Sequence, residues 1–237
     1  QQMASYEVRG YVRTTDAQRR AMKCAYYATI EHIDAELGRV LDWLDETGQR
    51  ANTLVIFNSD HGDMQGDHGI FQKGPHLYEG AVRVPLILSW PGTLPQDRQY
   101  SALVEQVDIV PTIHDLLGLP IPPRMQGKSL LPLLGKECHT QEFRAGVYSE
   151  YYNANPAETS PLRQPTYATM WRTKTHKIIV YHGQELGELY DLELDPDEFV
   201  NLWDEPASNS IKQALMKQCF DASVFTMDPL PERSAGF

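Results

Sequence analysis

Residues 52–75, NTLVIFNSDHGDMQGDHGIFQKGP, constrain the fold of this chain more than any other segment. The run begins with continuous β-branched and aliphatic residues, which is typical of a strand buried on both faces of a parallel sheet. Carboxylates, histidines, glycines and a lysine follow at once. In open α/β sheets, ligands bind at the carboxyl ends of such strands, where loops vary without disturbing the core. The segment therefore predicts an α/β protein with a polar site directly behind one strand.

A long amphipathic helix is expected before this strand. Over residues 16–46, apolar side chains recur at spacings of three and four, which is the period of one helix face. Thr14 or Thr15 can cap the start of this helix, and Gly48 is expected to end it.

Three further segments extend the predicted core. Residues 83–92, RVPLILSWPG, are expected to form a second strand. Residues 107–118, VDIVPTIHDLLG, predict a helix with Asp108 near its cap and Gly118 at its end. Strand, helix and strand in alternation imply a layered α/β core. Residues 145–152, AGVYSEYY, are expected to add one more strand to that core.

The pattern changes toward the C-terminal part of the chain. From Thr166 onward, polar and apolar residues alternate, which predicts an antiparallel meander followed by a closing helix over residues 208–221. A stretch rich in proline and polar residues separates the two patterns and indicates a domain boundary near 150–165. We therefore expect one domain over residues 1–155. A smaller subdomain of antiparallel sheet, helix and extended tail is expected over residues 156–237.

The charge balance excludes several classes of partner. The chain carries 21 basic and 32 acidic residues, a formal net charge of -11, whereas a surface that binds nucleic acid or an anionic membrane is basic. The sequence also lacks a stretch of about 18 apolar residues, so no membrane-spanning segment is expected. Cys24, Cys138 and Cys219 have neither metal-site nor disulfide spacing, which favours a reducing, cytoplasmic compartment.

The polar loop behind the first strand is a candidate metal and anion site. Asp60 would offer a hard oxygen donor and His61 a neutral nitrogen donor to a divalent cation. Lys73 would place a positive charge beside a tetrahedral anion. An Asp-His-Gly tripeptide alone is more often a plain turn, so local chemistry leaves both interpretations open. The acidic segment DLELDPDEFVNL lacks the central glycine and terminal glutamate of a calcium loop, and we interpret it as a turn.

A resemblance to a known family shifts this balance toward the metal site. NTLVIFNSDHGDMQGDHGIFQKGPHLYEGAVRVPLILSWPG closely resembles the core motif of the type I sulfatases, which belong to the alkaline phosphatase superfamily. YYATIEHIDAELGRVLDWLDETG is similar to the helix that precedes this motif. MWRTKTHKIIVYHGQELGELYDLELDPDEFVNL is similar to the C-terminal subdomain of the family. The resemblance implies a layered, alkaline-phosphatase-like α/β core that is incomplete at its N-terminus, followed by a small subdomain.

The resemblance also implies roles for individual residues. Asp60 and His61 would be metal ligands, and Lys73 would contact the sulfate and bridge toward the nucleophile. His76 would help to bind substrate or protonate the leaving group. Many arylsulfatases carry Asn where this chain carries His61. The histidine instead resembles the choline-sulfatase and phosphonate monoester hydrolase branches. A nitrogen ligand shifts the preference from calcium toward manganese, and both metals stay open.

The nucleophile motif of the family is absent from these 237 residues. Sulfatases oxidise a Cys or Ser within Cys/Ser-x-Pro/Ala-x-Arg to formylglycine, and no cysteine or serine of this chain has that context. The early paired aspartates that complete the metal shell in the family are missing as well. We therefore expect the formylglycine upstream of this chain. The chain is interpreted as the C-terminal portion of a sulfuric ester hydrolase for small sulfate esters, inactive alone.

Two other functions stay open. A phosphonate monoester or phosphodiester hydrolase would share the scaffold and the Asp-His pair. A non-catalytic binding or assembly fragment would account for the missing nucleophile, but not for the retained Asp60, His61 and Lys73. The tail FTMDPLPERSAGF is compatible with a crossing to a neighbouring subunit in a homo-oligomer and with a loose terminus.

Overall fold

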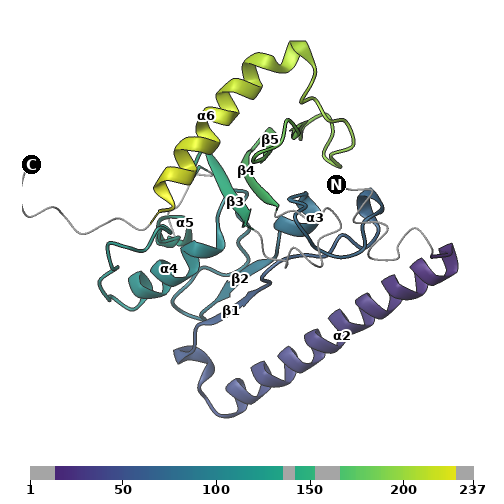
Figure 1. Ribbon diagram of the computed structural model, residues 1–237. Coiled ribbons are helices and arrows are strands. Elements are labelled where there is room, and N and C mark those ends of the chain that lie inside the picture. The colour runs from purple at the N-terminus through teal and green to yellow at the C-terminus, as the bar shows by residue number, and fades with distance from the viewer. Residues whose placement is uncertain (1–13, 136–141, 153–165, 228–237) are drawn as a thin grey trace, which may run out of the picture. The chain divides into compact units, whose positions relative to one another are not determined.

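The computed structural model describes residues 14–135, 142–152 and 166–227. The backbone divides into two compact units, of which the first ends at Arg98 and the second begins at Gln99. Figure 1 labels most of their helices and strands. Each unit is described separately.

The first unit begins with α2 (Asp16–Glu46), the long helix predicted from the sequence. Thr15 and Gln18 form a capping box, in which the Gln18 N–H donates to Thr15 Oγ1 at 3.3 Å and the Thr15 N–H donates to Gln18 Oε1 at 2.8 Å. Gly48 follows the helix with a φ of 68°, a left-handed conformation that glycine adopts without steric cost. The helix and its glycine end are confirmed, and of the two threonines that could cap the helix, Thr15 does so.

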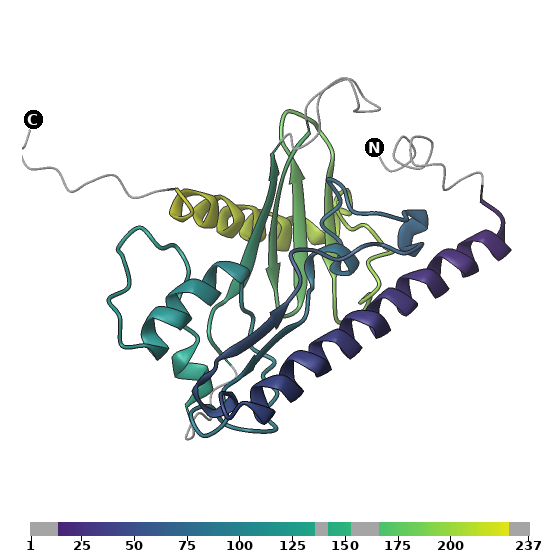
Figure 2. The same ribbon diagram turned by 90° about the horizontal axis from the view of Figure 1, so that it is seen from below.

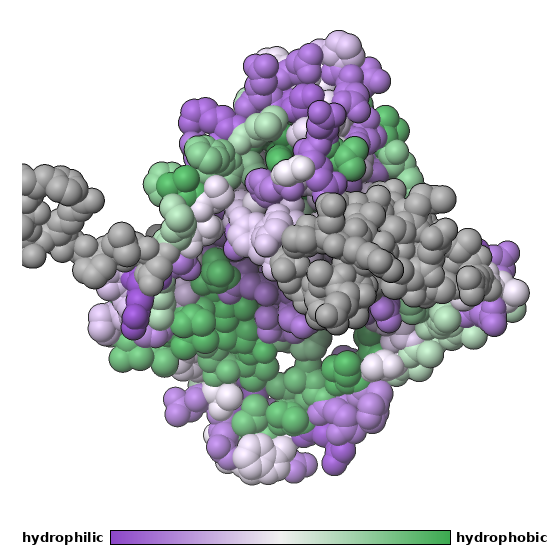
Figure 3. All heavy atoms as spheres, in the orientation of Figure 1, coloured by the Kyte–Doolittle hydropathy of each residue, from purple (hydrophilic) through white to green (hydrophobic). Residues whose placement is uncertain are grey.

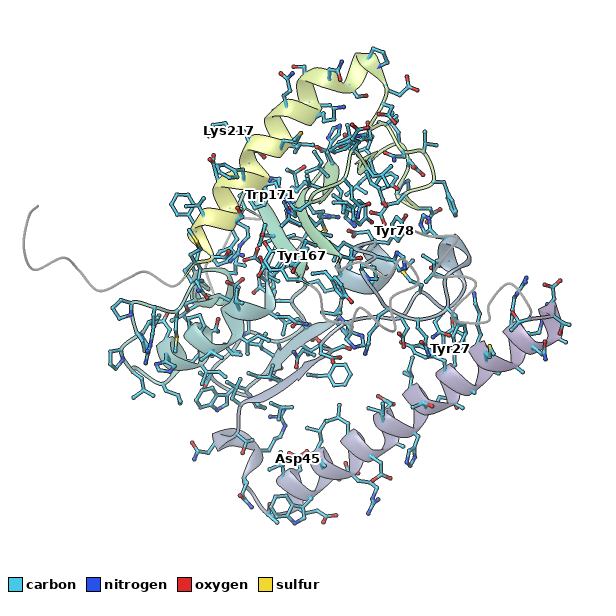
Figure 4. The ribbon with its side chains drawn as sticks, in the orientation of Figure 1. Tyr27, Asp45, Tyr78, Tyr167, Trp171 and Lys217 are labelled. Atoms are coloured by element: carbon cyan, nitrogen blue, oxygen red, sulfur yellow. The ribbon has the colours of Figure 1, made fainter. Side chains whose placement is uncertain are left out.

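Part of the apolar face of α2 is exposed. Leu44 is the one buried residue of this helix. Met22, Ile30 and Ile33 lie on the same face and are 39%, 47% and 50% exposed. Tyr27, labelled in Figure 4, lies beside that face and is 63% exposed. Met22, Ile30 and Ile33 form an apolar stripe, and such exposed apolar surface is typical of a region that packs against further polypeptide or a partner.

Gly38 lies in the middle of α2, and a Cβ atom built there would meet no heavy atom within 4 Å. Because glycine costs a helix interior about 0.5–1 kcal/mol relative to alanine, we expect Gly38→Ala to raise the free energy of unfolding by that amount in urea titrations. Gly48→Ala is the matched control. A Cβ atom at Gly48 would also meet no heavy atom within 4 Å, but Gly48 has a positive φ, so this substitution should lower the free energy of unfolding. A change of the same sign in both variants would contradict the argument.

The first unit contains a two-stranded ladder. β1 (Val55–Asn58) pairs with β2 (Leu86–Ser89) in antiparallel register, with Val55 opposite Ser89. The prediction of parallel, fully buried strands is wrong for this pair, since most of its residues are only partly buried and Ile87 is 57% exposed. Figure 3 shows in green the apolar surface of the described residues that face the viewer. A continuous apolar run indicates a strand but carries no information on the direction of its partner.

Short helical segments complete the first unit: η2 (Arg50–Asn52), η3 (Asp67–Gly69) and α3 (Glu79–Val82).

The second unit is built on a four-stranded antiparallel sheet in the order β3-β4-β5-β6. Its strands are β3 (Gly146–Tyr152), β4 (Tyr167–Thr173), β5 (His176–Tyr181) and β6 (Gly187–Asp191). The predicted meander is therefore confirmed. The prediction that residues 145–152 extend the first core is wrong, because β3 pairs with β4 along its whole length. A strand pattern shows that a segment is extended, and long-range pairing decides which sheet it joins.

One face of this sheet is covered by α6 (Asn209–Phe225), as Figure 2 shows. Leu215 and Cys219 of the helix form an apolar cluster with Ile178 and Leu189 of the strands. Trp171, labelled in Figure 4, donates from Nε1 to the Gln218 side chain at 2.8 Å. The closing helix predicted over 208–221 is confirmed. It follows η5 (Pro206–Ser208).

The second unit also contains η4 (Gln106–Asp108), α4 (Ile109–Leu116) and α5 (Leu131–Leu134). Asp108 is fully buried at the start of α4 and accepts two hydrogen bonds from Arg144 Nη2, at 2.6 and 2.8 Å. The backbone N–H groups of Glu105 and Lys128 each donate to the same carboxylate at 2.8 Å. This carboxylate therefore joins the helix start to the segment that leads into β3.

Several predictions concern residues outside the described ranges. The domain boundary at 155/156 falls within residues 153–165, and Cys138 and most of the C-terminal tail also lie outside. The boundary and the subunit-crossing tail therefore stay predictions. Cys24 and Cys219 have free thiols. Among the described helices, none has the length and apolar character needed to cross a membrane.

Candidate active site

Backbone hydrogen bonds hold the polar loop that follows β1. The Gly62 N–H donates to the Ala81 carbonyl of α3 at 2.8 Å, and the Gln65 N–H donates to the Phe71 carbonyl at 2.9 Å. Gly62 also lies against the backbone of Gly80, since a Cβ atom at Gly62 would be 2.0 Å from the Gly80 carbonyl oxygen. Glycine is required here because two backbone segments approach closely.

We expect Gly62→Ala to lower the free energy of unfolding by about 1–3 kcal/mol, because the added methyl group forces the loop away from α3. Urea titration monitored by circular dichroism measures this change. Gly80→Ala is the matched control, since its Cβ atom would meet Met64 Sδ, on a flexible side chain, at 3.4 Å. Equal losses of unfolding free energy in the two variants would contradict the argument that Gly62 must be glycine because it lies against the backbone of Gly80.

Asp60 and His61 point donor atoms at a common position beyond the end of β1. Asp60 Oδ1 accepts the His61 backbone N–H at 3.0 Å, and Asp60 Oδ2 is 3.4 Å from His61 Nε2. His61 Nδ1 lies 3.0 Å from the Gly62 carbonyl oxygen. A carbonyl only accepts, so Nδ1 carries the hydrogen and Nε2 keeps its lone pair. The Asp60 side chain is 84% exposed and that of His61 is 34% exposed.

Lys73 joins this pair from the far side of the loop. Its ammonium group hydrogen-bonds to His61 Nε2. Its backbone N–H donates to Asp63 Oδ1 at 3.1 Å, which ties the two ends of the loop together. The structure thus brings the side chains of Asp60, His61 and Lys73 to one place, and the roles assigned to them stay predictions.

His76 occupies a different environment. Its side chain is buried, with 3% exposure, and its ring lies nearly parallel to that of Tyr78 at a centroid distance of 6.3 Å. His68 also stacks on Tyr78, at 4.0 Å. Neither His68 nor Tyr78 was predicted from the sequence as a site residue. Tyr78 could have been found from its position two residues after His76, because side chains at alternate positions of an extended segment share one side. The proton-donor role of His76 stays a prediction.

The donor set fits a divalent cation in part. Asp60 and His61 supply one oxygen and one nitrogen, whereas calcium takes six to eight ligands and transition metals commonly take four to six. Among the residues that the structure describes, no group of three or more His, Cys, Asp or Glu side chains is placed so that it could hold a metal ion. The pair can therefore hold one side of a metal ion but cannot complete its shell.

The acidic segment after β6 is a turn, as predicted. Asp191 Oδ1 accepts the backbone N–H groups of Glu193 and Leu194 at 3.0 and 3.1 Å, and Asp195 Oδ2 accepts that of Val200 at 2.7 Å. These carboxylates therefore bind their own backbone.

Comparison with known proteins adds independent evidence. The family model described as "N-sulphoglucosamine sulphohydrolase, C-terminal" matches residues 66–224, and the model described as "Sulfatase" matches residues 2–119. The chain is 34% identical over 194 residues to an N-acetylglucosamine-6-O-sulfatase of Bacteroides thetaiotaomicron. That match covers 81% of this chain and 34% of the relative. The chain thus spans about a third of the length of the curated relatives that it matches.

Solved structures show the same partial coverage. A protein solved in complex with its substrate D-glucosamine-2-N,6-O-disulfate is 30% identical, with a TM-score of 0.76, over 89% of this chain and 42% of that one. A phosphonate monoester hydrolase of Agrobacterium radiobacter is 27% identical, with a TM-score of 0.80, over 90% of this chain and 43% of that one. The layered α/β fold predicted from the sequence is confirmed by these likenesses.

Proposed function

Because the chain belongs to the sulfatase family, we propose that it carries one part of the active site of a sulfuric ester hydrolase. The observation that carries this proposal is the convergence of Asp60 Oδ2, His61 Nε2 and the Lys73 ammonium group behind β1. An acidic chain that presents a carboxylate, a neutral imidazole and a cation at one place is suited to a metal-assisted reaction of an anionic ester.

Asp60 and His61 would hold a divalent metal, which would polarise a sulfate oxygen as a Lewis acid. The Gly62 carbonyl keeps His61 in the tautomer whose Nε2 can act as a ligand. Lys73 would stabilise the negative charge that develops on the ester oxygens. The mixed oxygen and nitrogen donors favour manganese over calcium. We retain His76 as the proposed proton donor to the leaving group.

We propose that polypeptide outside these 237 residues supplies the remaining metal ligands and a formylglycine nucleophile. Two observations support this proposal. The described residues offer two metal donors where a complete shell needs more, and the apolar stripe of α2 is exposed where a folded domain would cover it. The similarity to relatives that act on sulfated glucosamine supports a small sulfated sugar as the substrate.

The second candidate is a phosphonate monoester or phosphodiester hydrolase. It is favoured by the similarity to the Agrobacterium enzyme and by a histidine, rather than an asparagine, beside Asp60. Sulfate monoesters and phosphonate monoesters are both tetrahedral anions with one negative charge, so Asp60, His61 and Lys73 suit either substrate.

A substrate panel tests the proposed function. The protein expressed from its complete reading frame would be loaded with Mn²⁺ or Ca²⁺ and assayed with an aryl sulfate, an aryl phosphonate monoester and an aryl phosphodiester. We expect the largest kcat/KM for the sulfate, and only background rates for the 237-residue chain alone. A preference for the phosphorus esters would establish the second candidate. Absence of turnover on all three would favour a non-catalytic module.

A further inference from the structure

We propose that His68 is a positioning residue, whose ring holds Tyr78 in the place from which Tyr78 orders the loop that carries Asp60 and His61. This inference rests on the proposed function, because it assumes that these two residues belong to an active site. It assigns a role to a histidine that the proposed chemistry does not use. All four residues lie in the first unit.

The backbone of His68 has an unusual conformation for a residue with a side chain. Its φ is 52° and its ψ is 19°, which is the left-handed region that glycine adopts without steric cost. The loop of residues 64–71 uses glycine for this conformation at Gly66 and Gly69, whose φ values are 108° and 67°. Glycine would therefore suit position 68 as well, and an imidazole ring there costs backbone energy. The ring, rather than the turn, requires an explanation.

The His68 ring stacks on Tyr78. The two ring centroids are 4.0 Å apart, and the ring planes are 5° from parallel. Tyr78, labelled in Figure 4, is 1% exposed, so this contact belongs to the packed interior. The loop that carries His68 is closed by its own backbone, because the Gly66 N–H donates to the Ile70 carbonyl at 2.8 Å. A closed loop therefore places a planar ring against Tyr78.

Tyr78 connects this stack to the loop behind β1. Its carbonyl accepts the N–H groups of Ala81 and Val82 at 2.9 and 3.0 Å, which begins α3. The Ala81 carbonyl in turn accepts the Gly62 N–H at 2.8 Å. The Gly62 carbonyl lies 3.0 Å from His61 Nδ1. A shift of Tyr78 would therefore move the carbonyl group that fixes the tautomer of His61.

Tyr78 also lies beside the proposed proton donor. The centroid of the His76 ring is 6.3 Å from that of Tyr78, and the ring planes are 13° from parallel. His68 therefore acts on both His61 and His76 through one neighbour, and it need not contact the substrate. Because a displacement of about 1 Å in a reacting group can cost about 10²-fold in rate, loss of the stack should lower kcat.

Rate measurements on variants of His68 test this role. In the protein expressed from its complete reading frame, we expect His68→Gly to lower kcat for the aryl sulfate about 10–100-fold with little change in KM, because it removes the ring but suits the backbone. His68→Ala also removes the ring and should lower kcat in the same way. His68→Phe keeps a planar ring and should restore most of kcat with an unchanged pH profile.

Asp97→Gly is the matched control for these variants. Asp97 is an exposed residue with a φ of 53°, and it lies outside the loop of residues 64–71. The substitution therefore replaces a left-handed residue by glycine, as His68→Gly does, but leaves the stack on Tyr78 intact. We expect its kcat to equal that of the unmodified protein.

Hydrogen exchange measured by mass spectrometry gives a readout that does not depend on turnover. We expect the Gly62 amide to exchange faster in His68→Gly and His68→Ala, and at the unmodified rate in His68→Phe and Asp97→Gly. A normal kcat or a normal Gly62 exchange rate without the ring would overturn the positioning role, and so would a failure of His68→Phe to restore them. Absence of turnover by the unmodified protein on every ester of the panel would overturn the proposed function, and the exchange rates would still decide the role of His68.

Discussion

Replacement of Asp60 by Asn, in the protein expressed from its complete reading frame, is expected to lower kcat/KM for a sulfate ester by at least about 10³-fold. Asparagine keeps the shape of the side chain, and its carbonyl oxygen can still accept the His61 N–H that Asp60 Oδ1 accepts at 3.0 Å. The substitution therefore removes the negative charge and leaves the loop in place. The loss would be measured at saturating metal, with initial rates on an aryl sulfate.

A control separates this effect from a general change of charge. Asp42 is an exposed residue of α2, so Asp42→Asn removes one negative charge from a surface that the proposed chemistry does not use. We expect its kcat/KM to stay close to that of the unmodified protein. Near-normal turnover by Asp60→Asn would remove Asp60 from the proposed metal site and, with it, the main support for the function.

Replacement of Lys177 by Met is expected to lower the free energy of unfolding by about 3–5 kcal/mol. Lys177 Nζ lies 2.6 Å from Glu198 Oε1, and the two side chains are 0% and 2% exposed. Methionine fills a similar volume but removes the ammonium group that lies beside the buried Glu198 carboxylate. The desolvation cost of this buried charge is then offset less than in the unmodified protein. Urea titration monitored by circular dichroism would measure the loss.

Lys217→Met is the matched control for this prediction. Lys217, labelled in Figure 4, pairs with Asp221 at the same distance of 2.6 Å, but the two side chains are 74% and 47% exposed. An exposed pair on a helix contributes about 0.3–0.5 kcal/mol. We also expect the double variant Lys177→Met/Glu198→Gln to have a higher free energy of unfolding than Lys177→Met alone. Equal losses in Lys177→Met and Lys217→Met would contradict the argument from burial.

The candidate site could be predicted from the sequence only in part. The sequence showed that Asp60, His61 and Lys73 follow a strand and that their side chains suit a metal and an anion. The hydrogen bond from Lys73 to His61 Nε2 was not, because it depends on how the loop of η3 folds back on itself. The burial of His76 against Tyr78 also depends on the path of that loop.

The sequence by itself determined the local elements of this protein. The period of apolar residues specified α2, a threonine at 14 or 15 marked its start, and alternation specified the meander of β4, β5 and β6. These signals are contained within a few neighbouring residues. Capping, turn formation and amphipathic spacing act over one or two turns of chain, so they can be recognised without a fold.

Only the tertiary structure decided which distant segments meet. It paired β1 with β2 in antiparallel register, and it placed β3 in the second sheet rather than in the first core. It also buried Lys177, which an alternating strand pattern does not distinguish from a solvent-facing lysine, by bringing Glu198 beside it. Pairing and ion-pair burial depend on groups far apart in the chain. Their free energy arises when those groups approach, and spacing along the sequence does not encode that approach.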